Sequence, residues 1–247
     1  MRSNDKLAKR FSKTGGPGNG SGLFFALILL CGTFTGSHSA VRAADAGMPA
    51  SQGKTPATIL VFGDSLSAGY GIDPEQGWVN LLARQLTAQG YEYRVVNASV
   101  SGETTGGGQS RLPRALQLHR PEIVVLELGA NDGLRGLPAS QVQSHLDSMI
   151  SLSRKQGAKV LLLGMRVPPN YGPDYAASFR AVFDALASKY ALPFVPFFLE
   201  AVALDSALIQ NDNLHPNAAA QPKLLADVWP ALKPLLTRAK TESKAKN

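Results

Sequence analysis

Short apolar runs of the kind that form buried β-strands alternate along this sequence with longer stretches whose apolar residues recur at helical spacing. Alternation of this kind favours one doubly wound α/β domain with a parallel sheet, because right-handed crossover connections permit few other arrangements. The run at residues 123–128 is almost wholly apolar, as expected for a central strand that is covered on both faces. The expected strands are residues 59–62, 93–97, 123–128, 160–163 and 194–196.

Helices are expected between and after these strands, around residues 78–86, 112–119, 142–150, 175–186 and 224–236. The third helix is expected to follow a loop at residues 133–138 and to open with a capping box made by Ser140 and Gln143. Residues 165–171 are too rich in proline for regular structure.

The N-terminal region has the three-part layout of a secretory signal peptide. Basic residues come first, an apolar run at residues 23–34 follows, and a tract of small residues leads to a plausible cleavage site before Ala44. The apolar run is shorter than the about 20 residues of a membrane-spanning helix, and Leu30 is too bulky for the position before a lipidated Cys31. The sequence thus predicts a signal peptide at 1–43, a linker at 44–55, a folded domain at 56–237 and a basic disordered tail at 238–247.

Charge and cysteine content exclude several classes of function. The net charge of +7 is concentrated at the two ends, since residues 1–43 carry six Lys and Arg against one Asp and the last ten residues are again basic. The remainder is close to neutral and shows no basic stripe of the kind that nucleic-acid binding requires. The single cysteine, Cys31, lies in the predicted signal, which excludes a catalytic cysteine and Cys-ligated zinc from the mature chain.

The first strand delivers a serine to the end of the predicted sheet. Residues 59–62 are followed by Gly63, Asp64 and Ser65. Ligands of open α/β sheets bind outside the carboxyl ends of the strands, so Ser65 is a candidate nucleophile. The alternative is that Ser65 is a helix N-cap or a turn residue.

Further polar residues follow other strands or occupy a late loop. A nucleophilic serine needs a base, a group that orients the base, and hydrogen-bond donors for an oxyanion. His215 is the candidate base and Asp212, three residues earlier, could hold its imidazole. The backbone N–H groups of Ser65 and Gly102 and the side-chain amide of Asn131 are the candidate oxyanion donors.

Each of these residues also has a structural interpretation. A histidine in a loop is often a surface residue, Asp212 and Gly102 could be turn residues, and Asn131 could cap a helix. Asp64 and Asp132, next to the candidate residues, are expected to brace their loops by accepting backbone hydrogen bonds.

Together these residues resemble the four sequence blocks of the SGNH (GDSL-type) hydrolases, in order. The blocks are Gly63-Asp64-Ser65-Leu66-Ser67, Gly102, Gly129-Ala130-Asn131-Asp132 and Asp212-Asn213-Leu214-His215. Residues 97–104, 133–138 and 169–172 further resemble the bacterial periplasmic members that act as thioesterase, lysophospholipase and arylesterase. Ala130 stands where that group often has a second glycine.

The resemblance implies a flavodoxin-like, three-layer α/β/α fold with a five-stranded parallel sheet of order 2-1-3-4-5. It also implies the catalytic residues Ser65, Asp212 and His215 and the oxyanion donors Ser65, Gly102 and Asn131. It implies a substrate-binding loop that closes over the acyl chain and a substrate-binding wall. The loop comprises Gly133, Leu134, Arg135, Gly136, Leu137 and Pro138, and the wall includes Arg166, Pro168, Asn170 and Tyr171.

The expected function is that of a secreted or periplasmic serine esterase of esters and thioesters with apolar acyl groups, lysophospholipids included. The alternatives are a short-chain aryl or carbohydrate (acetyl) esterase with the same triad and, more remotely, a non-catalytic lipid or glycan binder. We expect no cofactor and no metal, no nucleic-acid partner, no stable membrane insertion after signal removal, and a monomer.

Overall fold

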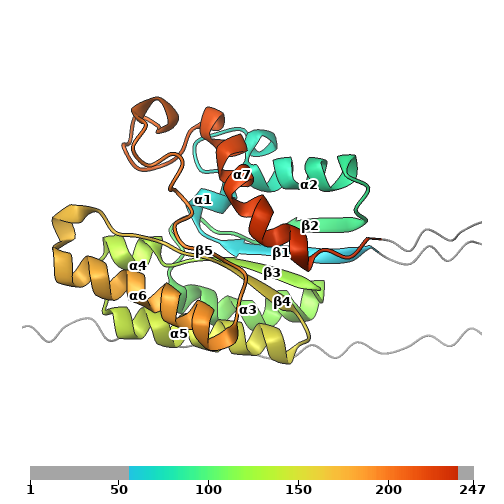
Figure 1. Cartoon of the computed structure of the whole chain (residues 1–247), viewed down its shortest axis with the longest axis horizontal. Coiled ribbons are helices and arrows are strands. Elements are labelled where there is room, and N and C mark those ends of the chain that lie inside the picture. Colours follow the sequence, from blue (N-terminus) through green and yellow to red (C-terminus); the bar gives the residue numbers. More distant parts are fainter. Residues whose placement is uncertain (1–55, 239–247) are drawn as a thin grey trace, which may run out of the picture. The chain divides into compact units, whose positions relative to one another are not determined.

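A parallel five-stranded sheet forms the middle of three layers (Figure 1). The computed structural model describes residues 56–238, and in this range the strand order is β2-β1-β3-β4-β5. The doubly wound fold predicted from the alternation, and the order implied by the resemblance, are both confirmed. The strands are β1 (Ala57–Gly63), β2 (Tyr93–Asn97), β3 (Ile123–Glu127), β4 (Lys159–Leu163) and β5 (Phe194–Val195).

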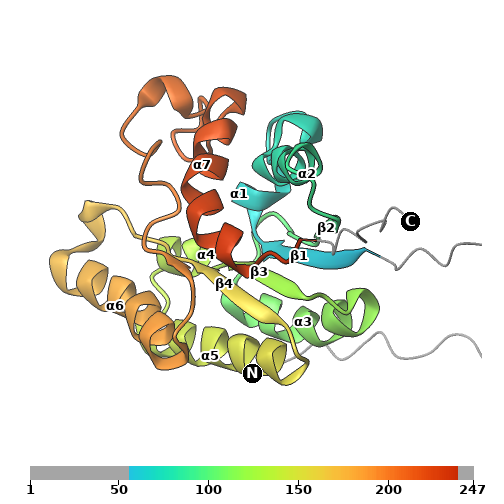
Figure 2. The same cartoon turned by 45° about the vertical axis from the view of Figure 1, so that its right-hand side comes forward.

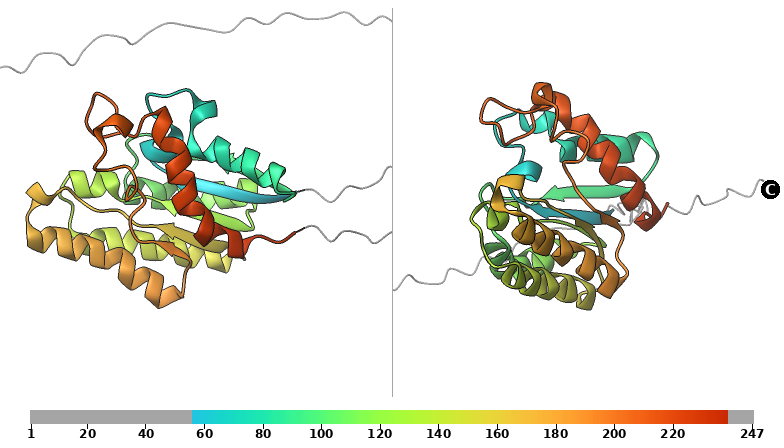
Figure 3. Two further views of the ribbon diagram at one scale, coloured as in Figure 1. Left: turned by 45° about the horizontal axis from the view of Figure 1, so that its top comes forward. Right: turned by 60° about the vertical axis from the view of Figure 1, so that its left-hand side comes forward.

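Helices cover both faces of the sheet (Figure 2). One face carries α2 (Trp78–Ala88) and α7 (Gln221–Leu232), which pack against each other. The opposite face carries α3 (Thr105–His119), α5 (Ala139–Lys155) and α6 (Pro173–Tyr190), and Figure 3 shows the two groups apart. Two short helices, α1 (Ser65–Ala68) and α4 (Ala130–Leu134), follow β1 and β3 at their carboxyl ends.

The core lies against both faces of the two central strands. Every residue of β3 is buried, and so are six of the seven residues of β1. The helices present their apolar stripes to these strands, for example Leu82 and Leu86 of α2, both fully buried. α1 begins two residues after the end of β1, and α4 begins three residues after the end of β3, so the two central strands position both short helices.

Several local predictions are wrong. The capping box of Ser140 and Gln143 does not form, because α5 begins at Ala139 with Pro138 as its N-cap, which places Ser140 inside the first turn. Residues 133–138 are not all loop, since Gly133 and Leu134 belong to α4.

Two proline-containing segments also differ from expectation. Residues 165–171 contain one 3₁₀ turn, Pro169–Tyr171. The last α-helix ends at Leu232 and continues as the 3₁₀ turn Lys233–Leu235, because Pro234 has no N–H to continue the α-helical hydrogen bonds.

The predicted signal peptide and linker, and the basic tail beyond Arg238, lie outside the described residues. Within residues 56–238 no helix combines the length and the apolar character needed to cross a membrane.

Candidate active site

Ser65 lies at the carboxyl end of β1 as the first residue of α1. Asp64 caps this helix, because its Oδ1 accepts a hydrogen bond from the Leu66 N–H at 3.0 Å. The alternative interpretation of Ser65 as the N-cap is therefore wrong. Being the first helical residue, Ser65 has a backbone N–H with no acceptor inside the helix, and the residue as a whole is 9% exposed.

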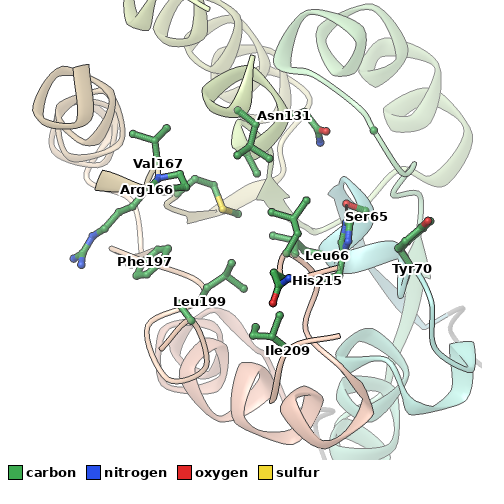
Figure 4. A pocket seen from close by; sticks show the side chains of 18 of the residues that line it. Ser65, Leu66, Tyr70, Asn131, Arg166, Val167, Phe197, Leu199, Ile209 and His215 are labelled. Carbon is green, nitrogen blue, oxygen red and sulfur yellow. Dashed lines mark hydrogen bonds between the residues drawn. The ribbon is translucent and has the colours of Figure 1, made fainter. Parts of the chain in front are cut away.

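His215 comes from the loop before α7 and lies beside Ser65, which is 150 residues earlier in the chain (Figure 4). Asp212 lies three residues before His215 in the same loop. The Ser65 Oγ and His215 Nε2 are 2.9 Å apart, and the His215 Nδ1 and Asp212 Oδ2 are 2.7 Å apart. Asp212 Oδ1 also accepts the backbone N–H groups of Leu214 and His215. The Ser65 hydroxyl, the His215 imidazole and the Asp212 carboxylate thus form a series of two hydrogen bonds, the arrangement expected of a serine, a base and an orienting carboxylate.

The charge of Asp212 fixes the direction of these hydrogen bonds. The backbone hydrogen bond from His215, followed by its ring hydrogen bond, lowers the pKa of Asp212 to about 2. An ionised carboxylate can only accept, so Nδ1 of the imidazole carries hydrogen and Nε2 offers its lone pair to the Ser65 hydroxyl. The arrangement therefore leaves Nε2 free to take a proton from Ser65.

Gln210 connects the loop of His215 to the segment after α1. Its Nε2 donates to the carbonyl oxygens of Tyr70, at 2.8 Å, and Pro216, at 3.0 Å. The ring of Tyr70 packs against the His215 imidazole at an interplanar angle of 42°, with 4.6 Å between centroids. Sequence reasoning missed both residues, because neither belongs to a strand end or to a catalytic residue type.

The residues of the three candidate oxyanion donors, Ser65, Gly102 and Asn131, line the same cavity as His215. Gly102 has a φ of +79°, a left-handed conformation that favours glycine. The Nδ2 of Asn131, in α4, donates one hydrogen to Asp64 Oδ2 at 3.1 Å. An amide nitrogen carries two hydrogens, so the second remains available to a ligand.

Two buried aspartates brace the short helices, as predicted. Asp64 caps α1, and Asp132 accepts the Thr105 N–H at 2.8 Å and the Thr105 hydroxyl at 2.6 Å. Asp132 thereby ties the start of α3 to α4, the helix that carries Asn131. A third buried acid, Glu127 at the end of β3, was missed because it reads as part of an apolar strand.

A cavity of about 520 Å³ opens beside Ser65, and most of its lining is apolar. Of the ten predicted substrate-binding residues, Leu134, Arg166 and Pro168 line it. Seven do not: Gly133, Arg135, Gly136, Leu137, Pro138, Asn170 and Tyr171. Arg135 instead donates to the Gly102 carbonyl at 3.2 Å.

Two tyrosine hydroxyls hold the chain around α4 in place. Tyr171 donates to the Leu134 carbonyl at 2.7 Å, and Tyr175 donates to the Leu137 carbonyl at 2.8 Å. Tyr171 therefore does not line the cavity itself but hydrogen-bonds to Leu134, which does.

Sequence reasoning missed the cavity wall that follows β5. Phe197, Leu199, Ala203 and Leu204 line the cavity there, together with Ile209 from the late loop. The signal that could have found this wall is the apolar pair Phe197-Phe198 just past the end of a strand. Within residues 56–238, no group of three or more His, Cys, Asp or Glu side chains is arranged to hold a metal ion.

Comparison with known proteins connects this geometry to a family. The model of the GDSL-like Lipase/Acylhydrolase family matches residues 61–221. Esterase TesA of Pseudomonas aeruginosa is 54% identical over 179 residues, which cover 72% of this chain and 89% of that protein. Thioesterase 1/protease 1/lysophospholipase L1 of Escherichia coli K12 is 41% identical over 181 residues, which cover 72% and 85%.

A solved structure is similar as well. The crystal structure of the psychrotrophic esterase EstA from Pseudoalteromonas sp., inhibited by monoethylphosphonate, has a TM-score of 0.69 and 41% identity, covering 72% of this chain and 97% of that one. The family match spans more than half of the chain and includes the segments that carry Ser65, Asn131 and His215. This chain therefore belongs to the GDSL-like lipase/acylhydrolase family of SGNH hydrolases, which act on ester bonds.

Proposed function

We propose that this protein is an exported serine esterase that hydrolyses carboxylic esters and thioesters with apolar acyl groups. The observation that carries the proposal is the continuous hydrogen-bonded line from Ser65 through His215 to Asp212 at the mouth of an apolar cavity. In this proposal the protein acts as a monomer on a small-molecule ester, and no cofactor takes part.

The first half-reaction transfers the acyl group to the enzyme. Ser65 Oγ attacks the acyl carbon while its proton moves to His215 Nε2, and the Asp212 carboxylate stabilises the imidazolium that forms. The N–H groups of Ser65 and Gly102 and the free amide hydrogen of Asn131 donate to the oxyanion. His215 then returns the proton to the leaving alcohol or thiol as its bond to the acyl carbon breaks.

The second half-reaction releases the acid. Water takes the place of the leaving group, His215 removes one of its protons, and the hydroxide oxygen attacks the acyl carbon of the Ser65 ester. When the tetrahedral intermediate collapses, Ser65 Oγ leaves with the proton from His215. The enzyme returns to its starting state.

The cavity favours an uncharged acyl chain. Arg166 is the single Lys, Arg, Asp or Glu residue among the described residues that line the cavity. Its guanidinium pairs with the Glu200 carboxylate at 3.0 Å and lies over the Phe197 ring. Its charge is therefore already compensated. An exported enzyme does not meet cytoplasmic acyl-CoA, so lysophospholipids and other lipid esters are the substrates we propose.

The test of this function is a chain-length series of p-nitrophenyl esters on protein that lacks residues 1–43, beside the Ser65→Ala variant. We expect kcat/KM to rise from acetyl to medium acyl chains and to fall by about 10⁴-fold or more in Ser65→Ala. A preference for acetyl would instead support a short-chain aryl or carbohydrate esterase. An unchanged rate in Ser65→Ala would overturn the proposal.

A fluorophosphonate should label the wild-type protein at Ser65 and leave Ser65→Ala unlabelled. A protein that binds lipid or glycan without hydrolysing it would not be labelled.

Export follows from the predicted division into a signal peptide (1–43), a linker (44–55), a hydrolase domain (56–237) and a basic tail (238–247). Intact-mass analysis of the protein made with its own N-terminus in a secreting host is expected to show a mature chain that starts at Ala44. Retention of residues 1–43 in that preparation would contradict export by cleavage.

A further inference from the structure

The carboxyl group of Glu127 lies behind the proposed nucleophile, and no step above uses it. Glu127 is the last residue of β3, and its side chain is 0% exposed. Its Oε2 accepts the Ser67 hydroxyl at 2.6 Å and the Asp64 N–H at 3.3 Å. Oε2 of Glu127 thus accepts hydrogen bonds from one residue before and one residue after Ser65 in the sequence.

Gly63 makes room for this carboxyl. Gly63 pairs with Glu127 across the sheet, and a Cβ at Gly63 would collide with Glu127 Oε2 and come within 3.0 Å of Ser67 Oγ. Glutamate is almost never fully buried unless it is paired, so a buried carboxyl in a space of this kind needs a specific partner.

That partner is the second buried acid, Asp64. Asp64 is also 0% exposed, and its backbone N–H donates to Glu127 Oε2 at 3.3 Å, so that its charge acts on the Glu127 carboxyl. Two buried carboxylates whose charges act on each other repel, which favours a proton on one of them.

The surrounding contacts place the proton on Glu127. Both oxygens of Asp64 accept a donor, Leu66 N–H at 3.0 Å and Asn131 Nδ2 at 3.1 Å, which favours the ionised form of Asp64. Among the described residues, no donor reaches Glu127 Oε1. Burial, followed by the charge of Asp64, raises the pKa of Glu127 well above its usual value, while burial raises that of Asp64 to about 6.

We propose that Glu127 is a positioning residue that works in its protonated form. It accepts hydrogen bonds from Ser67 and from the Asp64 backbone, and it donates its own proton to the Asp64 carboxylate. The ionised Asp64 in turn holds Nδ2 of Asn131, so that the amide presents N–H rather than oxygen to the cavity. This inference rests on the proposed function, since it assigns these contacts to the nucleophile and its oxyanion donor.

Few other charges act on this pair. His215, from the loop before α7, is the further titratable group whose charge acts on Asp64, and Asp64 is the one whose charge acts on Glu127. Asp64, whose pKa is raised to about 6, also titrates between pH 5 and 8, but it is present in both wild type and Glu127→Gln, so the difference between these two proteins reports the proton that requires Glu127.

The first test is the stability of Glu127→Gln as a function of pH. A carboxyl whose pKa is raised by folding contributes stability that is complete below its unfolded pKa and is lost as pH rises toward its folded pKa. Glutamine does not titrate, but its amide can donate to Asp64 and its oxygen can accept from Ser67. We expect the Tm of Glu127→Gln to rise relative to wild type from pH 5 to 8, by up to about 3 to 5 °C per pH unit.

The matched control is Glu92→Gln at an exposed position, where the Tm difference should not change with pH. A Tm difference for Glu127→Gln that is equally independent of pH would overturn the proposal, because it would mean that folding binds no proton at this site.

The second test is the rate at which a fluorophosphonate labels Ser65 at pH 7, at a temperature where all variants are folded. Glu127→Gln should label at nearly the wild-type rate, whereas Glu127→Ala should label at least about 10-fold more slowly because the nucleophile and amide lose their alignment. Labelling of folded Glu127→Ala at the wild-type rate would contradict a positioning role.

If Glu127→Ala does not fold, Ser67→Ala takes its place, since it removes one of the two donors to Oε2. Slower labelling of folded Ser67→Ala supports the role, and labelling at the wild-type rate contradicts it. Failure of the wild type itself to label would contradict the proposed function, and the Tm measurement would still decide whether Glu127 binds a proton.

Discussion

The proposed nucleophile has carboxyl groups on two sides, and the two sides differ in solvent exposure and in the direction in which the pKa is shifted. On the open side, Asp212 is 38% exposed in its side chain and its pKa is lowered to about 2 by hydrogen bonds from the His215 backbone and ring. On the inner side, Asp64 and Glu127 are fully buried and burial raises the pKa of both.

The difference shows how one residue type serves two tasks. A carboxylate that must stabilise a transient imidazolium needs a permanent charge, and backbone donors near solvent supply that condition. A carboxyl that must hold a turn in a dry interior is less costly as a neutral acid. Asp212 is therefore suited to stabilise the imidazolium that forms when His215 takes a proton. The Asp64–Glu127 pair is suited to hold the backbone around Ser65 in place.

The largest expected effect comes from the open side. Asp212→Asn keeps an oxygen that accepts the Leu214 and His215 N–H groups, but its amide can offer a donor to the imidazole and favour the wrong tautomer. We expect kcat to fall by about 10⁴-fold with little change in Tm. Steady-state kinetics and a melting curve on the same sample check this, and a loss below 10-fold would remove Asp212 from the mechanism.

The second-largest loss of activity is expected at Asn131, whose amide donates to Asp64 on the inner side. Asn131→Ala removes the amide donor, and we expect kcat to fall by about 10²- to 10³-fold with KM nearly unchanged. Asn131→Asp should not restore activity, because a carboxylate cannot donate and would face Asp64. A rise in KM alone would show that Asn131 binds substrate without stabilising an oxyanion.

Gln210 supports the open side, because it links the loop of His215 to the segment after α1. Gln210→Ala removes the link from the loop of His215 to the Tyr70 carbonyl, and we expect kcat to fall by about 10-fold through misalignment of His215. The exposed Gln156, at the end of α5, provides a matched control as Gln156→Ala. Equal activity of the two variants would show that the loop holds His215 without Gln210.

The smallest effect is expected from Tyr70, whose ring packs against the imidazole. Tyr70→Ala removes a ring face that stabilises the imidazolium, and we expect kcat to fall by about 2- to 5-fold. Tyr70→Phe keeps the ring and should behave as wild type in the same ester assay. A large loss in Tyr70→Phe would mean that the hydroxyl, rather than the ring, contributes.

The sequence was most informative where local pattern decides structure. The strand ending at Gly63 and the polar residues after β3 could be placed at one edge of a sheet because parallel strands share that edge. Glu127 and Gln210 could not be assigned, since their roles depend on contacts 63 and 140 residues away in the chain. The capping box failed because Pro138 is the N-cap of α5 and Ser140 lies inside the helix.

The substrate side was the least predictable for a similar reason. Residues 133–138 form a continuous sequence block, but the cavity is lined by side chains from several separate segments, and only Leu134 of that block reaches it. Which side chains line a cavity depends on the packing of loops from different strand ends, and periodicity carries no information about that packing.

The most direct test of the central claim is to trap the acyl-enzyme. A p-nitrophenyl ester is mixed with the enzyme, the reaction is quenched in acid within milliseconds, and the peptides are analysed by mass spectrometry. We expect a burst of p-nitrophenol and a peptide carrying the acyl mass on Ser65, both absent in Ser65→Ala. Turnover that persists in Ser65→Ala, or an acyl group found on another residue, would contradict the claim.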